Sequence, residues 1–270
     1  MSQNNNEAIF NRLVEIMHEL RSEHGCPWDR EQTHQSLKQY AIEETYEVLE
    51  AIDSGNMDKL KEELGDLLLQ VVFHAEIATE NRQFTIYEVI DTVCEKLIRR
   101  HPHVFAEVKV DGVDGVLDNW EKIKKEEHKE ERNSVLDGVP IGLPALQKAE
   151  KYQRKAARVG FDWNDIAEPL EKVKEEFQEF EAVLNSRQLP VKGSPEWLKL
   201  EEEFGDILFS LVNVGRFLDI NAEIALGQTI NKFVNRFTYI EQEAAKLGKK
   251  LPEMTLAEMD RLWEQAKRNR

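Results

Sequence analysis

Two short acidic stretches decide the fold, and each of them occurs twice. Residues 43–47 read EETYE and residues 62–66 read EELGD; later in the chain, residues 175–179 read EEFQE and residues 202–206 read EEFGD. Both copies therefore carry Glu-x-x-Glu followed by Glu-x-x-Asp, in the same order. A repeat of this kind predicts two related modules rather than one irregular domain.

The spacing between the two stretches differs in one place. Glu44 and Glu63 are 19 residues apart, whereas Glu176 and Glu203 are 27 apart. The extra eight residues fall near 185–195, where two prolines and a glycine indicate a loop. An insertion confined to a loop leaves the helices on either side unchanged and supports the repeat.

The segments around these motifs have helical periodicity. Apolar residues recur at helical spacing through residues 42–52, and residues 67–78 and 207–218 are apolar on most faces, which is typical of helices buried in a bundle. Residues 108–112 (VKVDG) are the exception and fit either a short strand or a loop. We expect an all-α fold with two helical-bundle modules, residues 1–132 and 147–270, joined by a linker at 133–146 that contains two glycines and two prolines.

The acidic motifs predict metal sites. Residues three apart on a helix share a face, and the short link at residues 54–56 makes the two acidic helices antiparallel neighbours. Two carboxylates at ~4 Å repel each other by on the order of 4 kcal/mol at an intermediate dielectric, so a cation is expected between them. Oxygen ligands alone favour Mg²⁺, with Mn²⁺ as a substitute. The expected ligands are Glu44, Glu47, Glu63 and Asp66 in the first module and Glu176, Glu179, Glu203 and Asp206 in the second.

Two glycines stand inside the second motif of each copy. Gly65 and Gly205 lie between the carboxylates, in the interior of an expected helix, where glycine costs ~1 kcal/mol relative to alanine. Close helix packing and room for a metal-bound ligand are equally good explanations from the sequence.

The composition excludes several classes of function. The net charge of −16 and the absence of a dense basic stripe argue against a nucleic-acid partner. Two cysteines provide no disulfide framework, and no apolar run reaches the ~20 residues of a membrane helix. We expect a cytoplasmic protein with no membrane partner.

With these motifs, the chain resembles the MazG family of nucleoside triphosphate pyrophosphohydrolases in its two-domain form. Residues 26–29 (CPWD) and 160–163 (GFDW) also look like members of that family. The resemblance implies Mg²⁺ dependence, a homodimer and cleavage of NTP or dNTP between the α and β phosphates to NMP and pyrophosphate, as nucleotide-pool housekeeping. It also implies that the C-terminal module is the main active one.

The same resemblance, with the basic and aromatic residues of the second module, suggests where the nucleotide is held. The expected nucleotide-binding residues are Lys172, Lys199, Glu202, Lys232, Arg236, Trp263 and Lys267. Glu175, Glu176 and Glu202 are alternative candidates for the general base, and the sequence does not distinguish a base from a metal ligand. A non-enzymatic helical module that binds a basic protein is the alternative function.

Overall fold

The computed structural model describes residues 3–127, 134–184 and 189–268, and within them every regular element is helical. This confirms the all-α prediction. The chain divides into two units, Met1–Lys129 (unit 1) and Glu130–Arg270 (unit 2), which are considered separately below. The expected end of the first module, residue 132, lies outside the described residues, whereas the expected start of the second, residue 147, lies inside them.

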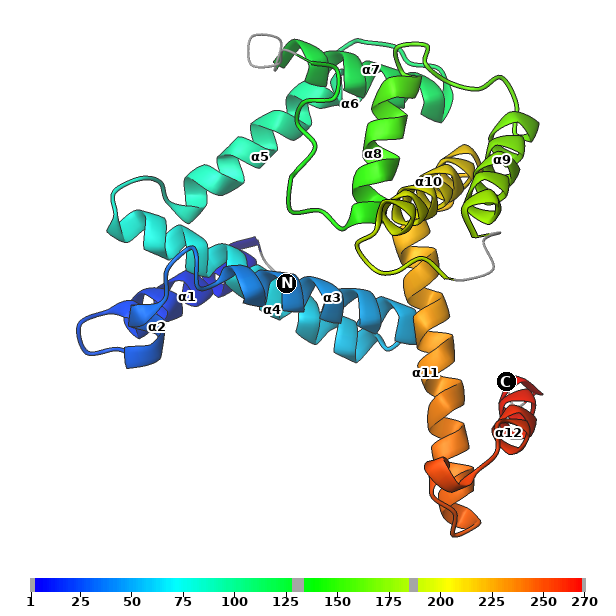
Figure 1. Cartoon of the computed structure of the whole chain (residues 1–270). Helices are drawn as coiled ribbons and strands as arrows, with labels where there is room; N and C mark the ends of the chain where they lie inside the picture. The colour runs from blue at the N-terminus through cyan, green and yellow to red at the C-terminus, as the bar shows by residue number, and fades with distance from the viewer. Residues whose placement is uncertain (1–2, 128–133, 185–188, 269–270) are drawn as a thin grey trace. The chain divides into compact units, whose positions relative to one another are not determined.

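Unit 1 is built around an antiparallel pair of helices, α3 and α4, with α1 packed against α4 (Figure 1). Its helices are α1 (Gln3–Arg21), α2 (Pro27–Glu31), α3 (Lys38–Ser54), α4 (Met57–Glu80), α5 (Ile86–Arg100), α6 (Pro102–Phe105) and α7 (Gly112–Glu127). Residues 108–111, for which a strand was one alternative, form neither strand nor helix.

Local signals explain why α3 and α4 form a hairpin. Helix α3 ends at Gly55, whose φ of 67° is accessible to glycine at little cost. The next residue, Asn56, caps α4, because its side chain accepts hydrogen bonds from the backbone N–H groups of Asp58 and Lys59. The reversal is therefore encoded in two residues, and it aligns the acidic motifs of the two helices.

The hydrophobic core of unit 1 lies between α1, α4 and the segment before α3. Met17, Leu37, Val72 and Phe73 are each at most 3% exposed and belong to one cluster with Ala75, Ile77 and Ile86. This packing holds the start of α3 against α4, which positions the carboxylates further along the hairpin.

Unit 2 repeats the hairpin with α9 and α10. Its elements are α8 (Ala145–Ala157), α9 (Ala167–Leu184), α10 (Pro195–Phe217), α11 (Ala222–Lys246), the short 3₁₀ helix η1 (Leu251–Glu253) and α12 (Leu256–Arg268). Ser194 caps α10 by accepting from the backbone N–H of Trp197, and Pro195 follows at the first helical position. Residues 185–188, in the predicted loop insertion, lie outside the described residues.

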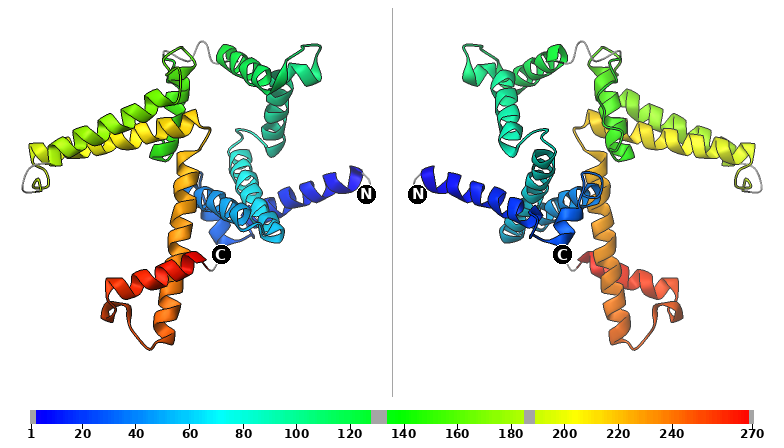
Figure 2. Two further views of the ribbon diagram at one scale, coloured as in Figure 1. Left: turned by 90° about the vertical axis from the view of Figure 1, so that its right-hand side faces the viewer. Right: turned by 90° about the vertical axis from the view of Figure 1, so that its left-hand side faces the viewer.

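Helix α11 starts against α8 and α10 and then extends well beyond them (Figures 1 and 2). Helix α12 packs on the far part of α11, away from α9 and α10 in both views. The hairpin and the α11–α12 pair are therefore separate parts of unit 2.

None of the helices in the described ranges combines the length and apolar character that crossing a bilayer requires.

Candidate metal and nucleotide site

Three carboxylates of unit 2 converge between α9 and α10. Glu176 and Glu179 come from α9 and Glu203 from α10, and one oxygen of each lies within 4.8 Å of the others. Glu176 and Glu203 are buried, whereas Glu179 is exposed. We call this group the C-terminal carboxylate cluster.

Asp206 lies beside this cluster without belonging to the tightest group. Burial raises the pKa of Asp206, and the negative charge of Glu176 raises it further. Burial and the negative charge of Glu179 likewise raise the pKa of Glu203. All four expected ligands therefore lie close together, and their mutual repulsion disfavours ionisation where no cation is present.

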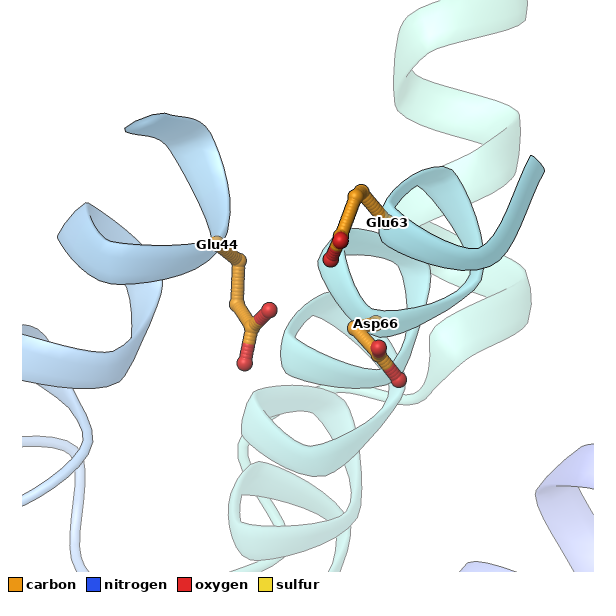
Figure 3. Close-up of side chains that lie close together, drawn as sticks. All are labelled: Glu44, Glu63 and Asp66. Atoms are coloured by element: carbon orange, nitrogen blue, oxygen red, sulfur yellow. The ribbon is translucent and has the colours of Figure 1, made fainter. Parts of the chain in front are cut away.

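Unit 1 carries a corresponding N-terminal carboxylate cluster of Glu44, Glu63 and Asp66. Figure 3 shows Glu44 on α3 facing the other two side chains on α4. Glu47 lies outside the tightest group, but its charge, after burial, raises the pKa of Glu63. In each unit the structure thus brings three of the four expected ligands into the tightest group. The fourth lies just outside that group and is Asp206 in unit 2 and Glu47 in unit 1.

Lys172 is the basic residue bonded to the C-terminal cluster. Its Nζ lies 2.8 Å from Glu176 Oε1 and 2.9 Å from Glu175 Oε1. Hydrogen bonds to both carboxylates hold the pKa of Lys172 well above its usual range. Glu175 and Glu202 are exposed beside the cluster, and Lys199 is close enough to oppose the rise in the pKa of Glu203.

The position four residues before the first Glu of the motif differs between the units. Unit 2 has Lys172 before Glu176, whereas unit 1 has Tyr40 before Glu44. Tyr40 packs edge-on against Trp28, with ring centroids 5.8 Å apart. The N-terminal cluster therefore has no cation at this position.

The two mid-helix glycines face open space. A Cβ added at Gly65 or Gly205 would meet no atom within 4 Å. Of the two explanations from the sequence, close helix packing within this chain is wrong for the described residues. Space beside the carboxylates is what the structure provides.

The remaining expected nucleotide-binding residues lie on α11 and α12. The Arg236 guanidinium stands over the Trp263 ring at 5.3 Å, and Lys267 pairs with Glu264. Lys232 is exposed on α11, one turn before Arg236. This part of unit 2 extends away from α9 and α10, the two helices that carry the C-terminal cluster (Figure 1).

Unit 1 has the same cation–π pair. The Arg100 guanidinium lies over the Trp120 ring, also at 5.3 Å. Here, however, Glu127 accepts from Arg100 Nε at 3.1 Å and from Arg99 Nε at 2.6 Å. The hydrogen bonds from the two arginines, Arg100 first, lower the pKa of Glu127 to about 2. The arginine of unit 1 is therefore already paired with a carboxylate.

Sequence analysis missed a cavity of about 470 Å³ next to the C-terminal cluster. Lys172, Glu176 and Asp206 stand on its wall, which otherwise includes Phe209 and Gln153. Besides Lys172, Glu176 and Asp206, sequence analysis had named only residues 160–163 of this wall, through the family resemblance. The remaining side chains carry no motif, because they come from α8, α9, α10 and the segment before α8 and are brought together by packing alone.

A histidine pair in unit 1 was also missed. The Nδ1 atoms of His34 and His74 lie 2.8 Å apart and the rings are stacked. Burial, and then the neighbouring His34, lower the pKa of His74. The two residues are 40 positions apart, so no local pattern could have linked them.

Comparisons with known proteins agree with this architecture. The family model of the MazG nucleotide pyrophosphohydrolase domain matches residues 32–105, which include the N-terminal cluster. The nucleoside triphosphate pyrophosphohydrolase/pyrophosphatase MazG of Thermotoga maritima is 48% identical over 259 residues, covering 96% of each chain. The nucleoside triphosphate pyrophosphohydrolase of Escherichia coli K12 is 44% identical over 96% of this chain and 97% of its own.

A third relative is longer. The uncharacterized protein YabN of Bacillus subtilis is 53% identical over 96% of this chain, which spans 51% of YabN. The Thermotoga and Escherichia relatives match this chain over nearly their whole length, at an identity well above what is needed to infer shared ancestry. This chain belongs to the MazG family of nucleoside triphosphate pyrophosphohydrolases.

Proposed function

We propose that the protein hydrolyses nucleoside triphosphates, ribo- or deoxyribo-, between the α and β phosphates. Water adds across that anhydride, the bond to the bridging oxygen breaks, and the products are a nucleoside monophosphate and pyrophosphate. The printed names of the Thermotoga and Escherichia relatives support the activity. The observation that carries the proposal in this chain is the convergence of carboxylates from two helices beside a cavity. Housekeeping of the nucleotide pool is the corresponding role.

The donor set fits Mg²⁺, with Mn²⁺ as a substitute. Every candidate ligand is a carboxylate oxygen, which a hard cation prefers, and burial first, then the neighbouring negative charges, raise the pKa values of Glu203 and Asp206. When bound, the cation neutralises charge that develops on the triphosphate and on the leaving pyrophosphate. Glu176, Glu179, Glu203 and Asp206 would hold it in unit 2, and Glu44, Glu47, Glu63 and Asp66 in unit 1.

The residues around the cluster divide into two roles. Lys172 and Lys199 supply positive charge beside the carboxylates and would bind phosphate oxygens. Glu175, Glu176 and Glu202 are the candidates to take the proton of the attacking water. Glu175 and Glu202 are exposed and therefore the better placed to reach a water molecule, while buried Glu176 is better suited to ligation.

Unit 2 is proposed as the main active unit. It joins Lys172, the carboxylate cluster and the cavity in one place. In unit 1 the corresponding lysine is replaced by Tyr40.

We also propose that the working form is a homodimer. Helix α10 exposes Phe204, Leu208 and Leu211, and α11 exposes Ile230, Phe233, Val234 and Phe237, each set at helical spacing. Continuous apolar stripes of this kind are unusual on a monomer. A second copy would cover them and would bring its own Lys232, Arg236, Trp263 and Lys267 to the C-terminal cluster, since within one chain α11 and α12 extend away from α9 and α10 (Figure 1).

The test is the identity of the products. Incubation with common NTPs and dNTPs and Mg²⁺ should release nucleoside monophosphate and pyrophosphate in equal amounts, with neither diphosphate nor orthophosphate at early times. EDTA should stop the reaction. Release of orthophosphate instead, or no hydrolysis of any triphosphate, would contradict the proposal and favour a binding module.

A further inference from the structure

The cavity of unit 2 lies directly beside the C-terminal carboxylate cluster. Its wall joins the carboxylate cluster at Lys172, Glu176 and Asp206, and away from this edge it combines aromatic, aliphatic and polar side chains. The volume of about 470 Å³ is within the range of ligand pockets, roughly 300–1,000 Å³. The aromatic side chains on the wall are Tyr152, Phe161, Trp163 and Phe209.

Gln153, on the wall of this cavity, carries a buried acceptor with no hydrogen-bond partner among the described residues. The residue is only 8% exposed, and its Nε2 donates to the backbone carbonyl of Phe209 at 2.8 Å. That bond fixes the amide, and Oε1 has no hydrogen-bond partner among the described residues. Leaving a buried acceptor unpaired costs about 1–3 kcal/mol, so a ligand that donates to it is favoured.

Asn213 is a second oriented amide on the same wall. Its Oδ1 accepts from Arg216 Nε at 2.8 Å, and Arg216 in turn pairs with Asp162, with Nη1 to Oδ2 at 3.0 Å. Burial alone would raise the pKa of Asp162, but the bonds from Arg216 and from the Trp163 backbone outweigh it and lower the pKa. With its oxygen occupied, the amide of Asn213 offers its nitrogen as a donor.

Unit 1 has the same helices and different side chains at these positions. Met17 lies four residues before the end of α1, as Gln153 lies four before the end of α8, and both side chains are buried. Phe73 follows Glu63 by ten positions, as Asn213 follows Glu203. Met17 and Phe73 are 1% and 3% exposed and belong to the hydrophobic core of unit 1.

From this comparison we infer that Gln153 and Asn213 are specificity-determining residues that bind the hydrogen-bonding edge of the nucleobase. Gln153 Oε1 accepts an N–H of the base, and the aromatic wall holds the ring. In unit 1, Met17 and Phe73 occupy the corresponding positions, so neither amide is present there. The inference rests on the proposed function, because it assumes that the carboxylate cluster holds the phosphates of the same molecule.

Replacing Gln153 by the residue of unit 1 tests the inference. Gln153→Met should raise KM for ATP roughly five- to tenfold, as expected for one lost hydrogen bond, with little change in kcat. It should leave the hydrolysis of ribose 5-triphosphate, which has no base, at the wild-type rate. The thermal midpoint should stay the same or rise, because an unpaired acceptor has been removed.

A substrate change on the unaltered protein makes the result independent of whether the variant folds. N6,N6-dimethyl-ATP lacks the N–H donors of adenine, so wild type should bind it more weakly than ATP. Gln153→Met should treat the two nucleotides alike.

Wild-type protein that hydrolyses ATP, its dimethyl analogue and ribose triphosphate with equal kcat/KM would overturn this inference and leave the proposed function intact. An equal rise in KM for ATP and ribose triphosphate in Gln153→Met would overturn it as well, since the effect would then be structural. Failure of wild type to release pyrophosphate from any triphosphate would instead overturn the proposed function.

Discussion

The two units share a scaffold and differ in what surrounds their carboxylates. In both, an antiparallel helix pair brings three acidic side chains within 4.8 Å of one another. A cavity lies beside the cluster of unit 2, and at the positions that correspond to Gln153 and Asn213 of its wall, unit 1 has the core side chains Met17 and Phe73. The comparison teaches that repeated acidic motifs specify where a cation can bind, while the neighbouring side chains decide which molecule can accompany it.

A second difference concerns the arginine that stacks on tryptophan. In unit 1, Glu127 follows Trp120 by seven residues and binds Arg100. In unit 2 the residue seven positions after Trp263 is Arg270, so no carboxylate occurs at that place in the sequence. Two differences in different elements therefore both support the proposal that unit 2 is the main active unit.

Matched carboxylate variants should produce the largest effect. Glu203→Gln is expected to lower pyrophosphate release by at least roughly 100-fold, the order of loss seen when a group that stabilises transition-state charge is removed. Glu63→Gln at the corresponding position of unit 1 should leave the rate near that of wild type. Circular dichroism of both variants would show that the helices persist. An equal loss in the two variants would mean that both units are catalytic.

The arginine pair should give the next largest effect. Arg236→Ala is expected to lower kcat/KM by roughly 10- to 100-fold, because a charged hydrogen bond to phosphate is worth about 1.5–3 kcal/mol. Arg100→Ala should leave kcat/KM unchanged and reduce the thermal midpoint, since Glu127 loses its main partner. Kinetics and thermal denaturation on both variants separate the two outcomes. If Arg100→Ala also slowed hydrolysis, Arg100 would have a role in the reaction besides its ion pair with Glu127.

Acid should weaken unit 1 through Glu127. Its pKa is lowered from 4.5 to about 2 in the folded protein, so the unfolded chain binds the proton more readily. The stabilisation that Glu127 gains from its arginine partners is therefore complete above about pH 4.5 and is lost as the pH falls toward about 2. Thermal midpoints measured at decreasing pH should fall less steeply in Glu127→Gln than in wild type. Glu107→Gln, which removes one exposed carboxylate from the same unit, is the control and should keep the wild-type slope.

The smallest expected effect comes from the mid-helix glycines. Gly65→Ala and Gly205→Ala should each stabilise their helix by up to ~1 kcal/mol, because the added methyl group meets no atom of this chain. If a ligand or a second copy approaches the backbone in unit 2, Gly205→Ala should also reduce activity, whereas Gly65→Ala should not. Chemical denaturation and rate measurements would detect both changes. A loss of stability in either variant would show that the space beside that helix is occupied.

The sequence by itself determined the helices, the hairpins and the place of the acidic clusters. These depend on local signals, namely the 3.6-residue period, the caps at Asn56 and Ser194 and the three-residue spacing of the carboxylates within each acidic motif. The sequence also identified the family, because the two acidic motifs recur in order with their surrounding residues.

Only the tertiary structure decided which of the four expected carboxylates lies outside the tightest group in each unit, and only the tertiary structure revealed the cavity. The wall of that cavity comes from α8, α9, α10 and the segments before α8 and α9, and the partner of His74 is 40 residues away. The separation of Lys232, Arg236, Trp263 and Lys267 from the carboxylates likewise depends on the direction in which α11 leaves α10. Such features arise from side chains brought together by packing, and packing is set by the whole set of contacts rather than by any local pattern.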